Sequence, residues 1–416
     1  MEQNTGLKKL LPIGRDQWIV YILCLAVFAG FSSFRPVISI GVIGLIVFGL
    51  LSADIKSTFT TYFTRPAFYL NVIFFLVILV SVFFSENKVL GLTFLQIKLP
   101  FLFLPLAFCG YNFLDRAFFN KLLFAFAAVM TISALAVMGN YILHFDTINQ
   151  HIISGGIIPT PFSHIRYTLL LVFAFFCLIW LWEERIIQCR FLLLIPSVFI
   201  FAVVHILSSR SGWVALYIGL LLYLTSYIIR YRKYFAGALM LGVILVLPLI
   251  FYQFVPSFHY KIDYMRWSQG QYREGHIDDM SDAMRMASWQ TGIEIIKRHP
   301  YTGVGAGDML SESKKISKEL FPAMRNEEDR KMPHNEFIWI WAATGVFGLI
   351  AYCIAFFYPF VTNFRHRNWL FATLFIIFLT SFMTEAPLEE QIGSTFYLLF
   401  LLIFLTHFNY SPAAND

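Results

Sequence analysis

Charged side chains are scarce in this chain of 416 residues. Asp, Glu, Lys and Arg make up only 13% of it, where a soluble globular domain carries about 25%. Apolar residues make up 58%, and phenylalanine alone supplies 47 positions. This composition excludes an ordinary soluble domain and predicts an all-α polytopic membrane protein.

Cysteine is also rare, and acidic pairs of the kind that hold metals are missing. The five cysteines (Cys24, Cys109, Cys177, Cys189 and Cys353) lie in or beside apolar runs and form no C-x-x-C motif, which argues against a disulfide framework or a thiolate metal site. The chain has no D-x-D motif, and Asp278-Asp279 is only a weak carboxylate pair. We therefore expect no metal and no other cofactor.

The net charge of +6 does not indicate a nucleic-acid partner. The basic residues lie mostly in short loops between apolar runs, and this distribution predicts the membrane topology. Residues 1–16 are polar, and no small-residue cleavage site follows the first apolar run. We interpret that run as an uncleaved first span.

Apolar runs of spanning length, about 17–25 residues, divide the chain. We place twelve spans near residues 17–31, 36–52, 67–85, 92–109, 118–142, 163–182, 190–207, 211–229, 234–254, 335–361, 369–384 and 392–408. Three parts follow: nine spans in 1–254, a large polar loop in 255–333, and three spans in 334–416.

Lysine and arginine gather in alternate loops, which predicts the orientation. The basic set is Lys8, Lys9, Arg15, Lys56, Arg65, Arg116, Lys121, Arg185, Arg190, Arg230, Arg232, Lys233, Arg365 and Arg367. The opposite short loops contain little beyond Arg35 and Lys88, and 143–162 and 385–391 contain neither residue type. We expect both termini to be cytoplasmic and the large loop to lie outside.

Within that loop, residues 282–298 predict a helix with Ser281 as a plausible N-cap, and His299-Pro300 ends it. Residues 301–307 form a glycine-rich turn, and the charged segment 311–331 is expected to be partly helical.

Cationic side chains gather at the outer face, where each costs a few kcal/mol against hydrocarbon. Arg166 and Arg210 begin spans, Lys98 lies about two turns inside one, and Arg285 lies on the loop helix. A bound anion such as a diphosphate would compensate them. Each also has a structural interpretation: Lys98 snorkelling to the interface, Arg166 pairing with a lipid phosphate or a carboxylate, and Arg285 as a solvated charge.

His334 begins the tenth predicted span, in the pattern H-N-x9-G-x-x-G. Imidazole suits proton transfer near neutral pH, although a lone interfacial histidine is usually structural. We expect Gly345 and Gly348 to share one helix face, where they permit tight packing that fixes the depth of the histidine. Glu385, Glu389 and Glu390 lie in the turn before the last span. One of them is expected to orient His334 or to balance an arginine; the alternative is that they are exposed carboxylates.

The ordered motifs Ser209-Arg210-Ser211-Gly212, Arg285-x3-Trp289, Pro300-x2-Gly303-x-Gly305-x-Gly307 and His334-Asn335-x9-Gly345-x2-Gly348 resemble the O-antigen ligase/O-antigen polymerase superfamily. The resemblance covers residues 160–350 by motif and nearly the whole chain by topology.

This resemblance implies glycosyl transfer from a polyprenyl-diphosphate-linked glycan to an acceptor, lipid A-core in ligases, at the periplasmic face of the bacterial inner membrane. The two key arginines of the family correspond to Arg210 and Arg285, and its key histidine to His334. Arg166, Lys98 and Asn335 are expected to bind substrate. Besides these substrates we expect membrane lipids, and no nucleic acid, as partners.

Arginines near a leaving diphosphate would stabilise its developing charge without a metal, while His334 would deprotonate the acceptor hydroxyl in an inverting displacement. The alternatives are an O-antigen or exopolysaccharide polymerase with the same site, a protein O-oligosaccharyltransferase, and a lipid-linked glycan transporter. A transporter fits less well, because the spans are asymmetric about one loop and the ionisable residues gather at one face. A scaffold would not explain the aligned cations.

Overall fold

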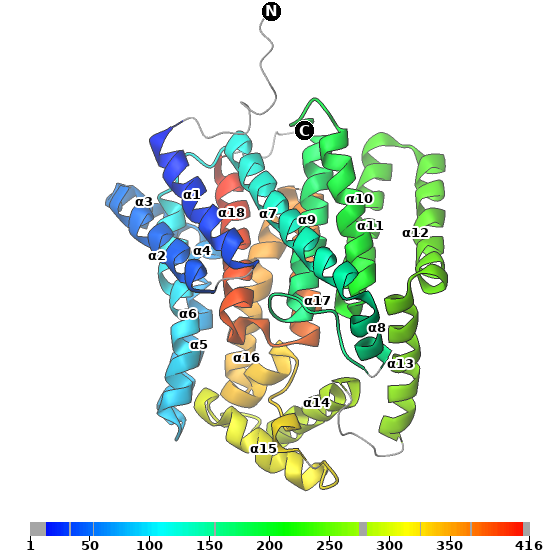
Figure 1. The fold of residues 1–416 in the computed structure, drawn as a ribbon. Helices are drawn as coiled ribbons and strands as arrows, with labels where there is room; N and C mark the ends of the chain where they lie inside the picture. The colour runs from blue at the N-terminus through cyan, green and yellow to red at the C-terminus, as the bar shows by residue number, and fades with distance from the viewer. Residues whose placement is uncertain are drawn as a thin grey trace, which may run out of the picture.

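The computed structural model describes residues 14–32, 35–52, 54–153, 155–273, 281–324, 326–366 and 368–410, and every regular element in these ranges is helical (Figure 1). The α-helices are α1 (Arg15–Gly30), α2 (Arg35–Ser52), α3 (Ile55–Thr64), α4 (Pro66–Tyr69), α5 (Val72–Phe84), α6 (Lys88–Cys109), α7 (Arg116–Leu143), α8 (Phe145–Ile153), α9 (His164–Glu183), α10 (Phe191–Leu207), α11 (Arg210–Tyr231), α12 (Tyr234–Phe254), α13 (Pro256–Arg273), α14 (Ser281–Arg298), α15 (Met309–Leu320), α16 (Glu336–Asn363), α17 (Trp369–Thr384) and α18 (Gln391–Tyr410). Short 3-10 helices include η2 (Ala306–Asp308), η3 (Glu327–Asp329) and η5 (Pro387–Glu389).

The predicted class of polytopic helical membrane protein is confirmed. Nine of the described helices are long and apolar enough to cross a membrane, and α10 and α17 are shorter apolar helices. Together with α1, they coincide with the twelve apolar runs of the sequence. The count of twelve spans stays a prediction.

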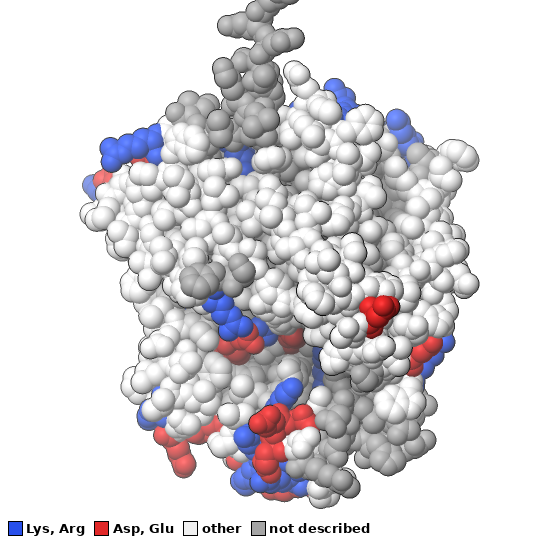
Figure 2. All heavy atoms as spheres, viewed as in Figure 1, with Lys and Arg blue, Asp and Glu red and all other residues white. Residues whose placement is uncertain are grey.

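The polar and apolar parts of the molecule are separated along one axis. In Figure 1, α1 begins and α18 ends at one end of the bundle, and α14 and α15 lie at the opposite end. Figure 2 shows charged side chains mainly towards these two ends, with a largely uncharged band between them. Which end faces the cytoplasm stays a prediction from the loop charges.

The loop beyond α13 contains the expected helices. α14 begins at Ser281, close to the predicted start, and ends at Arg298. α15 and η3 occupy the segment that was expected to be partly helical. The side chain of Ser281 and the pair Asp278-Asp279 lie outside the described part, so the cap and the weak carboxylate pair stay predictions.

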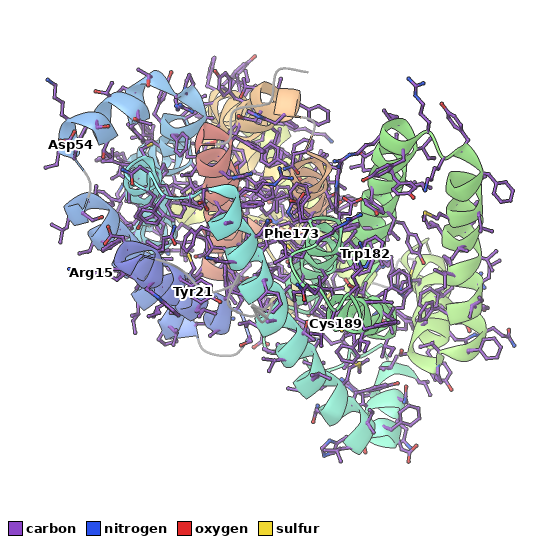
Figure 3. The ribbon with its side chains drawn as sticks, turned by 90° about the horizontal axis from the view of Figure 1, so that it is seen from above. Arg15, Tyr21, Asp54, Phe173, Trp182 and Cys189 are labelled. Atoms are coloured by element: carbon purple, nitrogen blue, oxygen red, sulfur yellow. The ribbon has the colours of Figure 1, made fainter. Side chains whose placement is uncertain are left out.

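Aromatic packing builds the core around α9 and α18, whose residues are mostly buried. Viewed along the bundle axis, Phe173 of α9 lies among the central helices, whereas Arg15 and Asp54 lie at the periphery (Figure 3). The Phe400 ring centroid is 4.7 Å from that of Phe126 and 4.8 Å from that of Phe173. Edge-to-face pairs of this kind give the core a defined geometry as well as buried apolar area.

The helix that follows His334 turns back on itself. The Tyr352 hydroxyl donates to Glu336 Oε1 over 2.5 Å, although the two residues are sixteen positions apart. A straight helix would separate them by about 24 Å. The reversal occurs at Gly345, whose φ is 73° and ψ −179°, so α16 consists of a short arm, 336–344, and a long arm, 346–363.

This reversal corrects the expectation that Gly345 and Gly348 share one helix face. Gly345 lies at the break between the two arms. Its positive φ would strain any L-residue with a side chain, which is why glycine suits this position. The amides of Val304 and Gly305 donate to the carbonyls of Ala342 and Ala343 over 2.9 and 2.8 Å. Backbone groups left open at the break are thus satisfied by the loop that follows α14.

The glycine-rich turn is also attached to the α5–α6 connection. The carboxylate of Asp308 accepts from the amides of Glu86 and Asn87 over 2.7 and 2.8 Å. A Cβ on Gly307 would overlap the carbonyl oxygen of Asn87. The turn therefore links the outer helices to both the amino-terminal bundle and the short arm of α16.

We expect Gly345→Ala to destabilise the protein by about 1–3 kcal/mol or more, because a positive φ is strained for alanine and its Cβ would overlap the Tyr301 carbonyl. Gly139→Ala is the matched control, since nothing lies within 4 Å of the Cβ position there. The measurement is the thermal unfolding temperature of each purified variant in detergent. Equal unfolding temperatures for the two variants would contradict the prediction.

Candidate active site

A cavity of about 430 Å³ opens between α11, α14 and α17. Arg210 of α11 and Arg285 of α14 both line it, although they are far apart in the sequence. Trp289, one turn beyond Arg285, adds an indole ring, and Met383 and Thr384 of α17 form the opposite wall. Two guanidinium groups around one concave, mostly apolar space make this the leading candidate for an anion-binding site.

Arg210 is placed by a tight connection between α10 and α11. Ser208 adopts a left-handed conformation with φ 56°, which ends α10 and allows α11 to begin at Arg210. Two residues later, a Cβ on Gly212 would overlap the side chain of Thr168 in α9. The small residues after Arg210 therefore permit the close approach of α11 to α9.

The His334 backbone is held by α14. Its carbonyl accepts from the Trp289 indole over 2.7 Å, and its amide donates to the Ser288 hydroxyl over 3.2 Å. The imidazole makes no hydrogen bond to any residue that the structure describes. Trp289 thus connects the histidine to the cavity of the two arginines, so Arg210, Arg285 and His334 come together in one region.

Burial lowers the pKa of His334 from its usual value to about 4, and the cations of Arg285, Lys331 and Arg166 lower it further. Glu390 opposes this shift. The imidazole is therefore neutral at physiological pH, which is the form that accepts a proton.

Lys261 of α13 is a cation near this site that sequence reasoning missed. Burial lowers its pKa to about 8, and the neighbouring guanidinium groups of Arg210 and Arg285 contribute to the shift. Burial also lowers the pKa of Arg285, against an opposing effect of Glu385. No motif marks Lys261, because only the fold brings α13 beside the ends of α11 and α14.

Arg166 lies in an ion-pair cluster with the segment 385–390. Its Nε is 2.8 Å from Glu385 Oε2, and its Nη1 contacts Glu390. Ser163, directly before α9, donates to the other Glu385 oxygen over 3.2 Å. Of the alternatives for these glutamates, pairing with an arginine is found for both Glu385 and Glu390, and the Glu390 side chain is also 49% exposed. Arg166 is also one of the cations that act on His334.

Lys98 lies in a second, fully buried cluster with the same segment. Its ammonium contacts Glu389 Oε1 at 2.8 Å and the Leu388 carbonyl at 2.5 Å, and its side chain has no exposed surface. Glu336 accepts from the Leu388 amide over 3.1 Å. Burial raises the pKa of Glu389, while Lys98 opposes the shift. This cluster connects α6 with the start of α16.

Asn335 has a capping position beside the histidine. Its side-chain oxygen accepts from the Ile338 amide, and its side-chain amide donates to the Met383 carbonyl, both over 3.1 Å. The residue is buried. It therefore fixes the start of α16 against α17, next to the cavity wall.

Residues 195–353 match the family model of the O-antigen ligase, which supports membership of this chain in the O-antigen ligase superfamily. The matched range contains the cavity arginines, His334 and the reversal of α16. No curated protein matches the chain. The matched family is one of glycosyltransferase-like membrane enzymes, and this chain is similar to it over residues 195–353.

We expect Lys98→Met to destabilise the protein by about 3–5 kcal/mol, because it leaves Glu389 buried without its cation. Lys98→Met combined with Glu389→Gln restores part of that loss, since the carboxylate that contacts Lys98 is then neutral as well. Arg116→Met is the matched control. It breaks the Glu184 pair, in which the arginine side chain is 61% exposed, and costs less than about 1 kcal/mol. Denaturant titration of the purified variants measures all three, and a stable Lys98→Met variant would contradict the assignment.

Proposed function

We propose that this protein is a glycosyltransferase of the O-antigen ligase type. It transfers a glycan from a polyprenyl diphosphate carrier to a hydroxyl of lipid A-core or a similar acceptor, at the periplasmic face of the inner membrane. The proposal is supported by the family match and, above all, by one observation. Arg210 and Arg285 line one cavity, and Trp289 of that cavity donates to the His334 carbonyl.

The arginines act on the leaving group. As the bond between the anomeric carbon and the phosphate oxygen breaks, negative charge grows on the polyprenyl diphosphate. Fixed guanidinium groups in a mostly apolar cavity stabilise this charge more in the transition state than in the ground state. Arg210 and Arg285 therefore take the part that a metal ion plays in other diphosphate chemistry, and Lys261 adds a third positive group beside them.

His334 acts on the acceptor. Its neutral imidazole accepts the hydroxyl proton as the acceptor oxygen forms its bond to the anomeric carbon. The polyprenyl diphosphate leaves with the electrons of the broken carbon–oxygen bond, and the anomeric configuration inverts. The hydrogen bonds that Ser288 and Trp289 make to the His334 backbone hold this base in position without using its ring nitrogens.

The remaining predicted substrate ligands divide by their contacts. Arg166 belongs to the edge of the site, where the substrate competes with Glu385 and Glu390 for its guanidinium group. Lys98 and Asn335 support the site from behind, because Lys98 has no exposed surface and both groups of the Asn335 amide are in use.

We expect His334→Ala to reduce glycan transfer about 10²–10⁴-fold, since that is the usual cost of removing a general base. The test is a strain that lacks the gene and carries the wild type, His334→Ala or His299→Ala. The last is the matched control, because His299 is an exposed histidine on the same outer segment. Glycan on the acceptor and on the carrier is measured by gel and mass spectrometry.

Full transfer by His334→Ala would remove the histidine from the mechanism. The species that accumulates identifies the acceptor: polymerised glycan on the carrier, with bare lipid A-core, indicates a ligase. Accumulated single repeat units indicate the polymerase, which shares these motifs.

The pH profile follows from the lowered pKa of His334. We expect kcat/KM to stay level as the pH falls from 8 to 5 and to decline only as it approaches about 4, where protonation removes the base. A bound diphosphate favours the imidazolium by its negative charge, so the decline in kcat lies at higher pH than the decline in kcat/KM.

Glu390→Gln gives the check on this profile. Because Glu390 raises the pKa of His334, its removal should move the decline in kcat/KM to lower pH. A decline centred near 6.5 in the wild type, the usual pKa of histidine, would contradict the assignment. Initial rates across a pH series with purified protein supply the measurement.

A further inference from the structure

The helix α13 bears aromatic side chains along one face, outside the candidate spans. Tyr260, Tyr264 and Trp267 follow one another at spacings of four and three, which place them on the same side of the helix. Trp267 is 53% exposed. The helix also carries charged residues, Asp263 and Arg266 among them, which would be costly in hydrocarbon. Burial in the hydrocarbon core therefore does not explain these aromatic rings.

These residues form most of a second cavity, of about 360 Å³, which Ile153 of α8 completes. The ring centroids of Tyr264 and Trp267 are 5.7 Å apart, with an interplanar angle of 44°. Figure 1 shows α8 and α13 side by side. The cavity thus has a broad aromatic wall and an open edge.

A fixed carboxylate borders the aromatic wall. Asp263 accepts from the Tyr252 hydroxyl over 3.3 Å and lies 3.1 Å from His259 Nε2. Its side chain is 48% exposed, so the carboxylate keeps capacity to accept further hydrogen bonds. Gly155, with φ 93°, lies so close that a Cβ there would be 2.8 Å from the Tyr264 ring. The backbone at Gly155 therefore packs against the Tyr264 ring, and only glycine fits at that position.

The aromatic cavity lies near the three cations of the candidate active site, Lys261, Arg210 and Arg285. Lys261 follows Tyr260 directly, and its ammonium lies 5.3 Å from the Tyr264 ring centroid. The same lysine is electrostatically coupled to Arg210 and Arg285. Lys261 thus lies near both the two cavity arginines and the Tyr264 ring of the aromatic wall.

We propose that Tyr260, Tyr264, Trp267 and Asp263 form a saccharide-binding subsite that holds sugar residues beyond the reacting one. The electron-rich faces of aromatic rings attract the polarised C–H groups of a sugar ring, and a carboxylate accepts hydrogen bonds from its hydroxyls. The saccharide that carries these sugar residues is covalently joined either to the diphosphate or to the attacking acceptor. A subsite for it must therefore border Lys261, Arg210 and Arg285. This inference rests on the proposed function.

The test uses full-length protein in lipid nanodiscs. Donors carry either one repeat unit or several on a polyprenyl diphosphate, and acceptors have either a complete or a truncated core. For Trp267→Ala and Tyr264→Ala we expect a KM roughly 3- to 10-fold higher for the longer saccharide, with kcat and the KM of the shorter substrate unchanged. Trp267→Phe and Tyr264→Phe retain a ring and recover most of the affinity.

Trp182→Ala is the matched control, because Trp182 is also partly exposed, at 39%, but lies on α9 away from α13. An effect that grows with donor length identifies the donor glycan as the occupant, and one that grows with core length identifies the acceptor. An equal effect on all substrates, a loss of insertion alone, or no effect would overturn the subsite.

Equilibrium binding separates this inference from the proposed function. The probe is the oligosaccharide that mild acid releases from the lipid-linked glycan of the producing cell. If Trp267→Ala binds the oligosaccharide more weakly than the wild type does, but the wild type transfers glycan from no donor, the function is rejected and the subsite is kept. If the wild type transfers glycan and Trp267→Ala transfers it equally well at every saccharide length, the subsite is rejected and the function is kept.

Discussion

The backbone hydrogen bonds at the reversal of α16 determine where the candidate base lies. Val304 and Gly305 donate to the last carbonyls of the short arm, and Gly345 allows the chain to turn there. Because the arm folds back, Glu336 meets Tyr352 of the long arm. His334 is thereby held at the end of a short helix against α14, beside the cavity between α11, α14 and α17, and not at the mouth of a continuous span.

Charge is distributed unequally around this base. Arg166 and Lys98 are matched by carboxylates of the segment 385–390, within contact distance. Burial lowers the pKa of Lys261, and the nearby guanidinium groups of Arg210 and Arg285 lower it further. A dianionic leaving group would be attracted by these three cations, whereas a neutral ligand would not. Electrostatics therefore favours the cavity over the two ion-pair clusters as the place where a diphosphate binds.

Local sequence was sufficient for the helices but not for their long-range partners. Apolar runs located the bundle, and capping and breaking residues located α14, because both signals act over a few residues. No local pattern predicts the reversal, since 337–361 is mostly apolar and Gly345 fits a packing role equally well. Lys98 and its partner Glu389 lie 291 positions apart, so no local pattern predicts that ion pair either. Lys261 carried no local signal.

The contacts at the break in α16 are made largely by main-chain atoms, and the side chains of Tyr301 and Thr302 in the adjoining turn are exposed. Tyr301 is 69% exposed, whereas Ala306 of the same turn is fully buried. The outer surface beside the site can therefore diverge in charge, size and polarity while the imidazole stays in register. Substitutions at these exposed positions can therefore alter what the outer surface contacts without moving the backbone that positions His334.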